Sequence, residues 1–169
     1  MDIACYTLRA FQNFRNEEPQ LSNKLIVPTP LSMFNADVWE LVGIKLIIMT
    51  FTSIEMSAIS KLALAMAAAD GKVEKSELGY IALELTRFGV KDADPILKGA
   101  DEMDPTIALS IVSKMTPKEK KYVAAYLGTV MAVDRNIDDK ELSLWRLTST
   151  LCGLPTMNIQ EAIQYIKEM

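Results

Sequence analysis

The stretch AMAAADGKVEKSELGYIA, residues 65–82, decides the fold, because it contains the end of one helix, a turn and the start of the next helix. The residues that lead into it, IEMSAISKLALAMAAA, are rich in Ala, Leu and Met and have no Gly or Pro before Asp70-Gly71. That composition predicts a helix over about 54–69. Glu74 and Glu77 are spaced as the N-cap and third residue of a following helix, which we expect from about 75.

The same pattern returns in residues 128–154, GTVMAVDRNIDDKELSLWRLTSTLCGL. A shift of 64 positions places Asp70 on Asp134 and Glu77 on Glu141. The shift also pairs Val73 with Ile137, Glu74 with Asp138, Leu78 with Leu142 and Gly89 with Gly153. The sequence therefore predicts one helical hairpin that occurs twice.

Within each predicted hairpin the two helices differ in character. The helix before the aspartate is apolar nearly all round, which is typical of a helix in the middle of a bundle. The helices after the loop, at about 75–88 and 139–151, are amphipathic and should pack outside the central pair. We expect a pseudo-two-fold axis to relate the hairpins. The two acidic loops would then lie either at one end of the bundle or at opposite ends.

Further helix starts are marked by capping residues. Asp94, Asp104 and Thr116 each precede a proline, a pairing that places a side-chain acceptor at the N-cap and proline at the first helical position. Asn158 and Glu161 form the pattern of a capping box, so the last helix should cover about 159–168. No stretch after residue 53 alternates in the manner of a strand. We therefore expect an all-α, compact bundle of about seven helices.

The first 51 residues have a different pattern. Residues 19–32, PQLSNKLIVPTPLS, contain three prolines and no helical period, and only 37–49 could form a helix. We expect an N-terminal arm over 1–51 and one helical domain over 52–169. A start codon assigned too far upstream would also explain the change of pattern near Met49.

Composition excludes several classes of function. The chain has no histidine, which removes Ser-His-Asp and Cys-His catalysis, H-E-x-x-H metalloproteases and imidazole-dependent zinc sites. Cys5 and Cys152 lie far apart and give no disulfide framework. With 18 basic against 22 acidic residues and no strongly basic block, nucleic acid is not an expected partner.

The same features indicate a cytoplasmic location. The first residues lack the basic start and apolar run of a signal peptide. The most apolar window, LVGIKLIIMTF at 41–51, is interrupted by Lys45 and is shorter than the roughly 18–20 residues that span a bilayer. No transmembrane helix is expected, and a chain with two distant cysteines suits a reducing compartment.

The motif x-D-G-x-[VI]-[ED]-x-x-E-L at the end of an apolar helix, twice in one chain, resembles the tellurite-resistance TerB-like family of bacterial helical domains. It is also similar to the N-terminal domain of DnaJ-like membrane co-chaperones. The resemblance covers roughly residues 52–168. It implies a bundle of about seven helices, no established catalysis and acidic residues that could hold a divalent cation. By position these acids are Asp70, Glu74, Glu77, Asp134, Asp138 and Glu141. Copy two departs from the motif, since Arg135 replaces the glycine.

The acids also have a purely structural interpretation. Glu74 with Glu77, and Asp138 with Glu141, fit helix capping, which stabilises a helix by about 1 kcal/mol. An EF-hand is not supported. A loop with Asp134 at position 1 would have Asp139 at position 6 and Trp145 at position 12, where an EF-hand has Gly and Glu. Capping alone, and capping combined with a looser oxygen-ligand site for calcium or magnesium, both remain open.

Three functions are compatible with these features. The first is a non-enzymatic interaction or sensing module of a bacterial stress response of the tellurite-resistance kind, with a divalent cation at the acidic loops. The second is a metal-free module of the co-chaperone type that binds a protein partner, which could belong to a membrane-associated complex. The third is a carboxylate-based enzyme, which requires two acids that converge in a cleft, one with a raised pKa. We expect no enzymatic activity.

Overall fold

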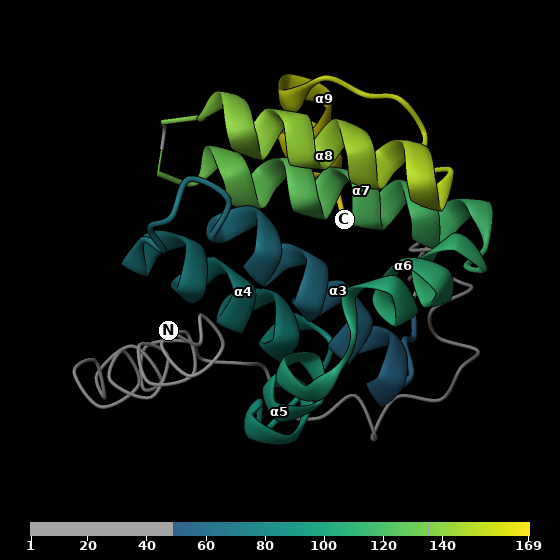
Figure 1. Ribbon diagram of the computed structural model, residues 1–169. Coiled ribbons are helices and arrows are strands. Elements are labelled where there is room, and N and C mark those ends of the chain that lie inside the picture. The colour runs from purple at the N-terminus through teal and green to yellow at the C-terminus, as the bar shows by residue number, and fades with distance from the viewer. Residues whose placement is uncertain (1–48, 135) are drawn as a thin grey trace, which may run out of the picture.

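The computed structural model describes residues 49–134 and 136–169, and over these residues it contains seven α-helices and no strand (Figure 1). This confirms the predicted all-α bundle. The predicted arm over 1–51 and its helix at 37–49 lie outside the described residues, except for positions 49–51. The helices are α3 (Ser53–Ala67), α4 (Lys75–Arg87), α5 (Asp94–Glu102), α6 (Pro105–Ser113), α7 (Pro117–Ala132), α8 (Asp139–Cys152) and α9 (Ile159–Lys167).

Helix starts follow the capping residues closely. Thr116 is the N-cap of α7, and its N–H donates to Glu119 Oε2 at 2.7 Å in a capping box. Asn158 caps α9 in the same way, and Asp104 Oδ1 accepts the N–H of Thr106 at 2.7 Å at the start of α6. Each cap satisfies backbone donors that have no partner inside the helix.

The start of α5 differs from the prediction. Its N-cap is Ala93, and Asp94 is already the first helical residue, with Pro95 following it. Asp92 Oδ1 accepts the N–H of Asp94 at 3.1 Å. The predicted side-chain cap by Asp94 is therefore wrong, and an aspartate turn at Asp92 precedes the helix instead, because an aspartate can bond the backbone two residues along the chain.

The core lies between α3 and α7, the two helices that are apolar nearly all round, and they pack directly on each other. Small residues allow this close approach: Ala63 on α3 and Ala124 on α7 are fully buried. Gly128 on α7 is packed against the neighbouring helices, since a Cβ there would lie 3.0 Å from both Ala162 Cβ and Trp145 Cζ2.

The amphipathic helices pack outside this pair, as predicted. On α4 the buried apolar side chains are Leu78, Ile81 and Leu85. On α8 they are Trp145 and Cys152. The short helices complete the bundle: α5 packs on α3, α6 contacts both α3 and α8, and α9 packs on α7 (Figure 1). No helix of the described part is long and apolar enough to cross a membrane.

The helix bounds repeat with the 64-residue offset. Adding 64 to the bounds of α3 and α4 gives 117–131 and 139–151. These ranges agree to within one residue with the bounds of α7 and α8. The two hairpins therefore agree in length and loop position. The pseudo-two-fold axis between them stays a prediction.

Candidate functional site: two acidic loops at one end of the bundle

Asp70 and Asp134 follow the two central helices. Because α3 ends at Ala67 and α7 at Ala132, neither aspartate belongs to a helix. Asp70 Oδ1 accepts the N–H of Lys72 at 2.7 Å, and Asp134 Oδ1 accepts the N–H of Asn136 at 2.9 Å. Each half-buried aspartate thus closes a short turn through its own side chain. That local role explains why an acid stands at these two positions.

Glu77 and Glu141 begin the two outer helices. Glu77 Oε2 accepts the N–H of Glu74 at 2.8 Å, and Glu141 Oε2 accepts the N–H of Asp138 at 2.9 Å. The predicted capping role of these two glutamates is therefore confirmed. Unlike ordinary capping acids, however, they are almost fully buried, with 2% and 4% of their surface exposed.

The remaining two predicted acids are the N-cap residues themselves. Asp138 Oδ1 accepts the N–H of Lys140 at 2.7 Å at the start of α8. Glu74 is exposed at the start of α4. Both positions are accounted for by helix capping, which satisfies free backbone donors.

The two loops lie at the same end of the bundle, which decides between the two arrangements left open by the sequence (Figure 1). The pKa of Glu77 is raised to about 7, chiefly by burial and also by the negative charges of Glu141, Asp134 and Asp70, while the Glu74 N–H acts to lower it. The pKa of Glu141 is raised by burial and by Asp134, Asp70 and Asp138. The carboxylates of one hairpin therefore repel those of the other.

The described residues do not form a ready metal site. Within 49–134 and 136–169, no group of three or more Asp, Glu or Cys side chains is placed so that it could hold a metal ion. Asp70, Asp134 and Glu141 do lie close enough to Glu77 for their negative charges to raise its pKa.

Other residues noted in the sequence have packing roles. Trp145 is buried, and its Nε1–H donates to the Ala124 carbonyl at 3.2 Å. Cys152 is also buried, with Sγ 3.6 Å from the Leu109 carbonyl, and burial raises the pKa of its thiol. The basic run at 118–121 opens α7, and Lys121 Nζ lies 4.7 Å from the centre of the Tyr165 ring.

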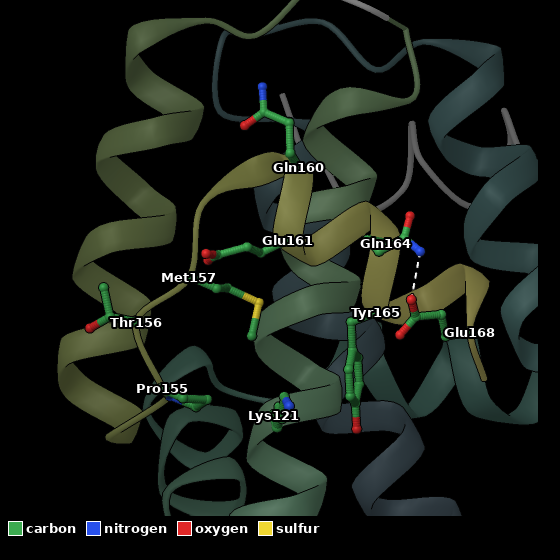
Figure 2. Close-up of a pocket in the computed structure, with 9 residues that line it drawn as sticks. All are labelled: Lys121, Pro155, Thr156, Met157, Gln160, Glu161, Gln164, Tyr165 and Glu168. Carbon is green, nitrogen blue, oxygen red and sulfur yellow. Dashed lines mark hydrogen bonds between the residues drawn. The ribbon is translucent and has the colours of Figure 1, made fainter.

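A shallow groove of about 520 Å³ lies beside α9 and was not predicted (Figure 2). Met157 and Tyr165 contribute apolar surface, and Lys121 lies below Met157 and beside the Tyr165 ring in the view of Figure 2. Its other lining residues are Pro155, Thr156, Gln160, Glu161, Gln164 and Glu168. None of the six predicted site residues lines this groove, so it is separate from the acidic loops.

A buried acid on α4 is a further feature that the sequence does not predict. Glu84 is 3% exposed, accepts the Tyr122 hydroxyl at 2.8 Å and forms an ion pair with Arg87 at 2.6 Å. In the sequence Glu84 resembles any polar residue of an amphipathic helix. Only the close aromatic surroundings provided by α7 reveal that it points inward.

No family model matches the chain, and no curated protein matches it. Among solved structures, the chain is similar to a protein of unknown function, PG1108, from Porphyromonas gingivalis W83. The two are 46% identical with a TM-score of 0.65, and the match covers 72% of this chain and all of the other. The chain therefore belongs to the same family of helical proteins as PG1108.

Proposed function

We propose that this chain is a non-enzymatic helical module of the TerB-like type. It would act in the cytoplasm in a bacterial stress response and bind a divalent cation such as calcium or magnesium between its two acidic loops. The observation that carries the proposal is that the two acidic loops meet at one end of the bundle, where Asp70, Asp134 and Glu141 lie close enough to Glu77 for their negative charges to raise its pKa. A divalent cation would offset the repulsion among these charges, because it favours the charged form of each carboxylate.

The chemistry of the donors supports this choice of cation. All the candidate ligands are carboxylate or backbone oxygens, which calcium and magnesium prefer and which suit softer metals poorly. Calcium also tolerates irregular coordination, so it suits loops of unequal sequence, where Gly71 in one corresponds to Arg135 in the other.

An acid–base enzyme is supported less well. Such an enzyme needs two carboxylates that face a substrate cleft. The raised pKa of Glu77 meets one requirement. However, the carboxylates of Glu77 and Glu141 each accept a hydrogen bond from a backbone N–H. Neither residue lines the groove beside α9.

Titration of ¹⁵N-labelled protein with calcium and with magnesium tests the proposal. We expect saturable amide shifts centred on 70–77 and 134–141 together, because one cation would contact both loops. Asp70→Ala should weaken both sets of shifts, whereas Glu102→Ala, at an exposed acid of α5, should leave them unchanged. Shifts that stay absent, or that scatter over all exposed acids at millimolar metal, would contradict the proposal.

A second candidate is a metal-free module that binds a protein partner. Leu147 and Leu151 lie one turn apart on α8 and are 54% and 55% exposed, and Ile107 on the adjacent α6 is also exposed. Neighbouring exposed apolar side chains are typical of a protein-binding surface. This function does not require the acidic loops, so variants of Asp70 and of Leu147 separate the two candidates.

A further inference from the structure

A small hollow lies where α3, α4 and α7 meet, and its volume is about 20 Å³. Roughly 10–15 Å³ of such space is enough for one water molecule, so the hollow has room for one water and for no larger ligand. Apolar side chains form part of its lining, namely Phe51, Met56, Ile59, Leu85 and Phe88. Each of the three helices also contributes a polar residue to it: Ser60 from α3, Glu84 from α4 and Tyr126 from α7.

These three polar residues are almost fully buried, with 2% of Ser60 and 3% of Glu84 and Tyr126 exposed. Glu84 already accepts two hydrogen bonds, one from Arg87 at 2.6 Å and one from the Tyr122 hydroxyl at 2.8 Å. An ionised carboxylate has about four acceptor positions, so Glu84 can accept a further donor.

The hydroxyls of Ser60 and Tyr126 have no hydrogen-bond partner within 49–134 and 136–169. Unlike Tyr80 Oη, neither is sealed in by protein atoms, so each borders space that a water can reach. The hollow is a space that both residues line. Burial raises the pKa of Tyr126 well above its ordinary value, and the charge of Glu84 raises it further. Tyr126 therefore keeps its proton and is available as a donor.

The repeat provides a counterpart of this junction. The 64-residue offset pairs the three polar residues with a set that contains no carboxylate and no tyrosine: Ala124, Thr148 and Leu62. At the counterpart the ring nitrogen of Trp145 donates directly to the Ala124 carbonyl. The hairpin fold therefore does not itself require polar residues at these positions. Buried groups of this kind normally have partners, which indicates that something at the α3–α4–α7 junction supplies them.

We propose that the hollow binds one ordered water molecule that links α3, α4 and α7. The water donates to the Glu84 carboxylate and to Ser60 Oγ, and it accepts the hydrogen of the Tyr126 hydroxyl. Three hydrogen bonds are typical of a buried water. Both hydroxyls gain the partner that the protein does not provide, because a bridging water replaces a direct hydrogen bond at little cost.

High-resolution crystal structures of the full chain, grown with chelator, test this proposal without reference to any cation. The wild type should show one water within hydrogen-bond distance of Ser60, Glu84 and Tyr126. Ser60→Ala/Tyr126→Phe removes two of its three partners and should lose it. The control, Ser57→Ala/Tyr165→Phe, makes the same chemical changes elsewhere and should keep it, because Ser57 Oγ already donates to the Ile96 carbonyl at 3.0 Å.

Oxygen-17 relaxation dispersion checks the same water in solution, since it counts long-lived waters directly. It should find one fewer in Ser60→Ala/Tyr126→Phe than in the wild type and in the control variant. A wild-type crystal structure without density in the hollow would overturn the proposal, and this result does not depend on whether the double variant folds. Equal numbers of long-lived waters in the wild type and a folded double variant would overturn it as well.

Discussion

Glu77 and Glu141 hold the same position in two different hairpins, and each accepts the backbone N–H of the residue three before it, at 2.8 Å and 2.9 Å. The two glutamates are almost fully buried, and the negative charge of Glu141 raises the pKa of Glu77. Helix capping therefore accounts for their hydrogen bonds, while their burial close to other acids costs free energy. That cost is the physical basis of the proposed cation response.

The raised pKa of Glu77 predicts a dependence of stability on pH. Its pKa is about 7 in the folded chain against 4.5 for an ordinary glutamate, so the folded state binds the proton more tightly than the unfolded state. The contribution of Glu77 is therefore fully present below about pH 4.5 and is lost as the pH rises to about 7, by at most about 3 kcal/mol. Urea unfolding at pH 5 and pH 8 measures this loss.

Glu77→Gln isolates the effect, because glutamine keeps an acceptor for the Glu74 N–H and does not titrate. The free energy of unfolding of Glu77→Gln minus that of wild type should therefore be larger at pH 8 than at pH 5. Glu161→Gln, at the same capping position of α9 but exposed, is the control and should follow the wild-type profile. Parallel profiles for wild type and Glu77→Gln would show that burial does not perturb this carboxyl.

Gly128→Ala should destabilise the fold although alanine is the better helix former. The new Cβ would lie 3.0 Å from Ala162 and from Trp145, so α8 and α9 would have to move. Overpacking costs about 1–3 kcal/mol and outweighs the gain of about 1 kcal/mol in helix propensity. Urea unfolding should show a net loss of about 1 kcal/mol, while Ser143→Ala on the exposed face of α8 should change little. A Gly128→Ala variant more stable than wild type would mean that this contact is looser than described.

Thr116→Ala should weaken the start of α7. The Thr116 hydroxyl accepts the N–H of Glu119 at 3.4 Å and donates to its carboxylate at 2.8 Å, so alanine leaves both groups without these partners. We expect a loss of about 1 kcal/mol in the free energy of unfolding. Thr150→Ala, whose hydroxyl donates to the Arg146 carbonyl in the last turn of α8, serves as the comparison and should have less effect. Equal losses for the two variants would argue against the cap.

Replacement of Leu147 and Leu151 by serine tests the second candidate function. Both side chains are more than half exposed, so the double variant should keep the stability of wild type to within about 0.5 kcal/mol for each site. If α8 contacts a protein partner, a partner identified with the wild-type chain should bind the variant at least tenfold more weakly. Unchanged affinity for that partner would remove α8 from the interface.

Much of the fold could be predicted because the chain marks its helix ends locally. Thr116, Asp104 and Asn158 are capping residues whose geometry depends only on their immediate neighbours. The start of α5 differs from the prediction, because Asp94 lies inside the helix and its N–H bonds Asp92, a choice between two nearby aspartates that local sequence does not decide.

The candidate site was predicted only in part. The acids at 70, 77, 134 and 141 could be found by the repeat, but whether the loops meet depends on how α3 packs against α7. The burial of Glu84 could not be predicted either, because a carboxylate on an amphipathic helix normally faces water. Its inward position follows from the Tyr122 hydroxyl, which lies 38 residues away in the sequence.

Isothermal titration calorimetry of the wild-type chain with calcium chloride at pH 7.5 tests the central claim most directly, with Asp70→Asn/Asp134→Asn as the matched variant. The account predicts a saturable heat that corresponds to one cation for each chain, because both loops contribute to one site, and no such heat in the double variant. Heats of dilution alone for the wild type up to millimolar calcium and magnesium, or equal heats for wild type and double variant, would contradict it.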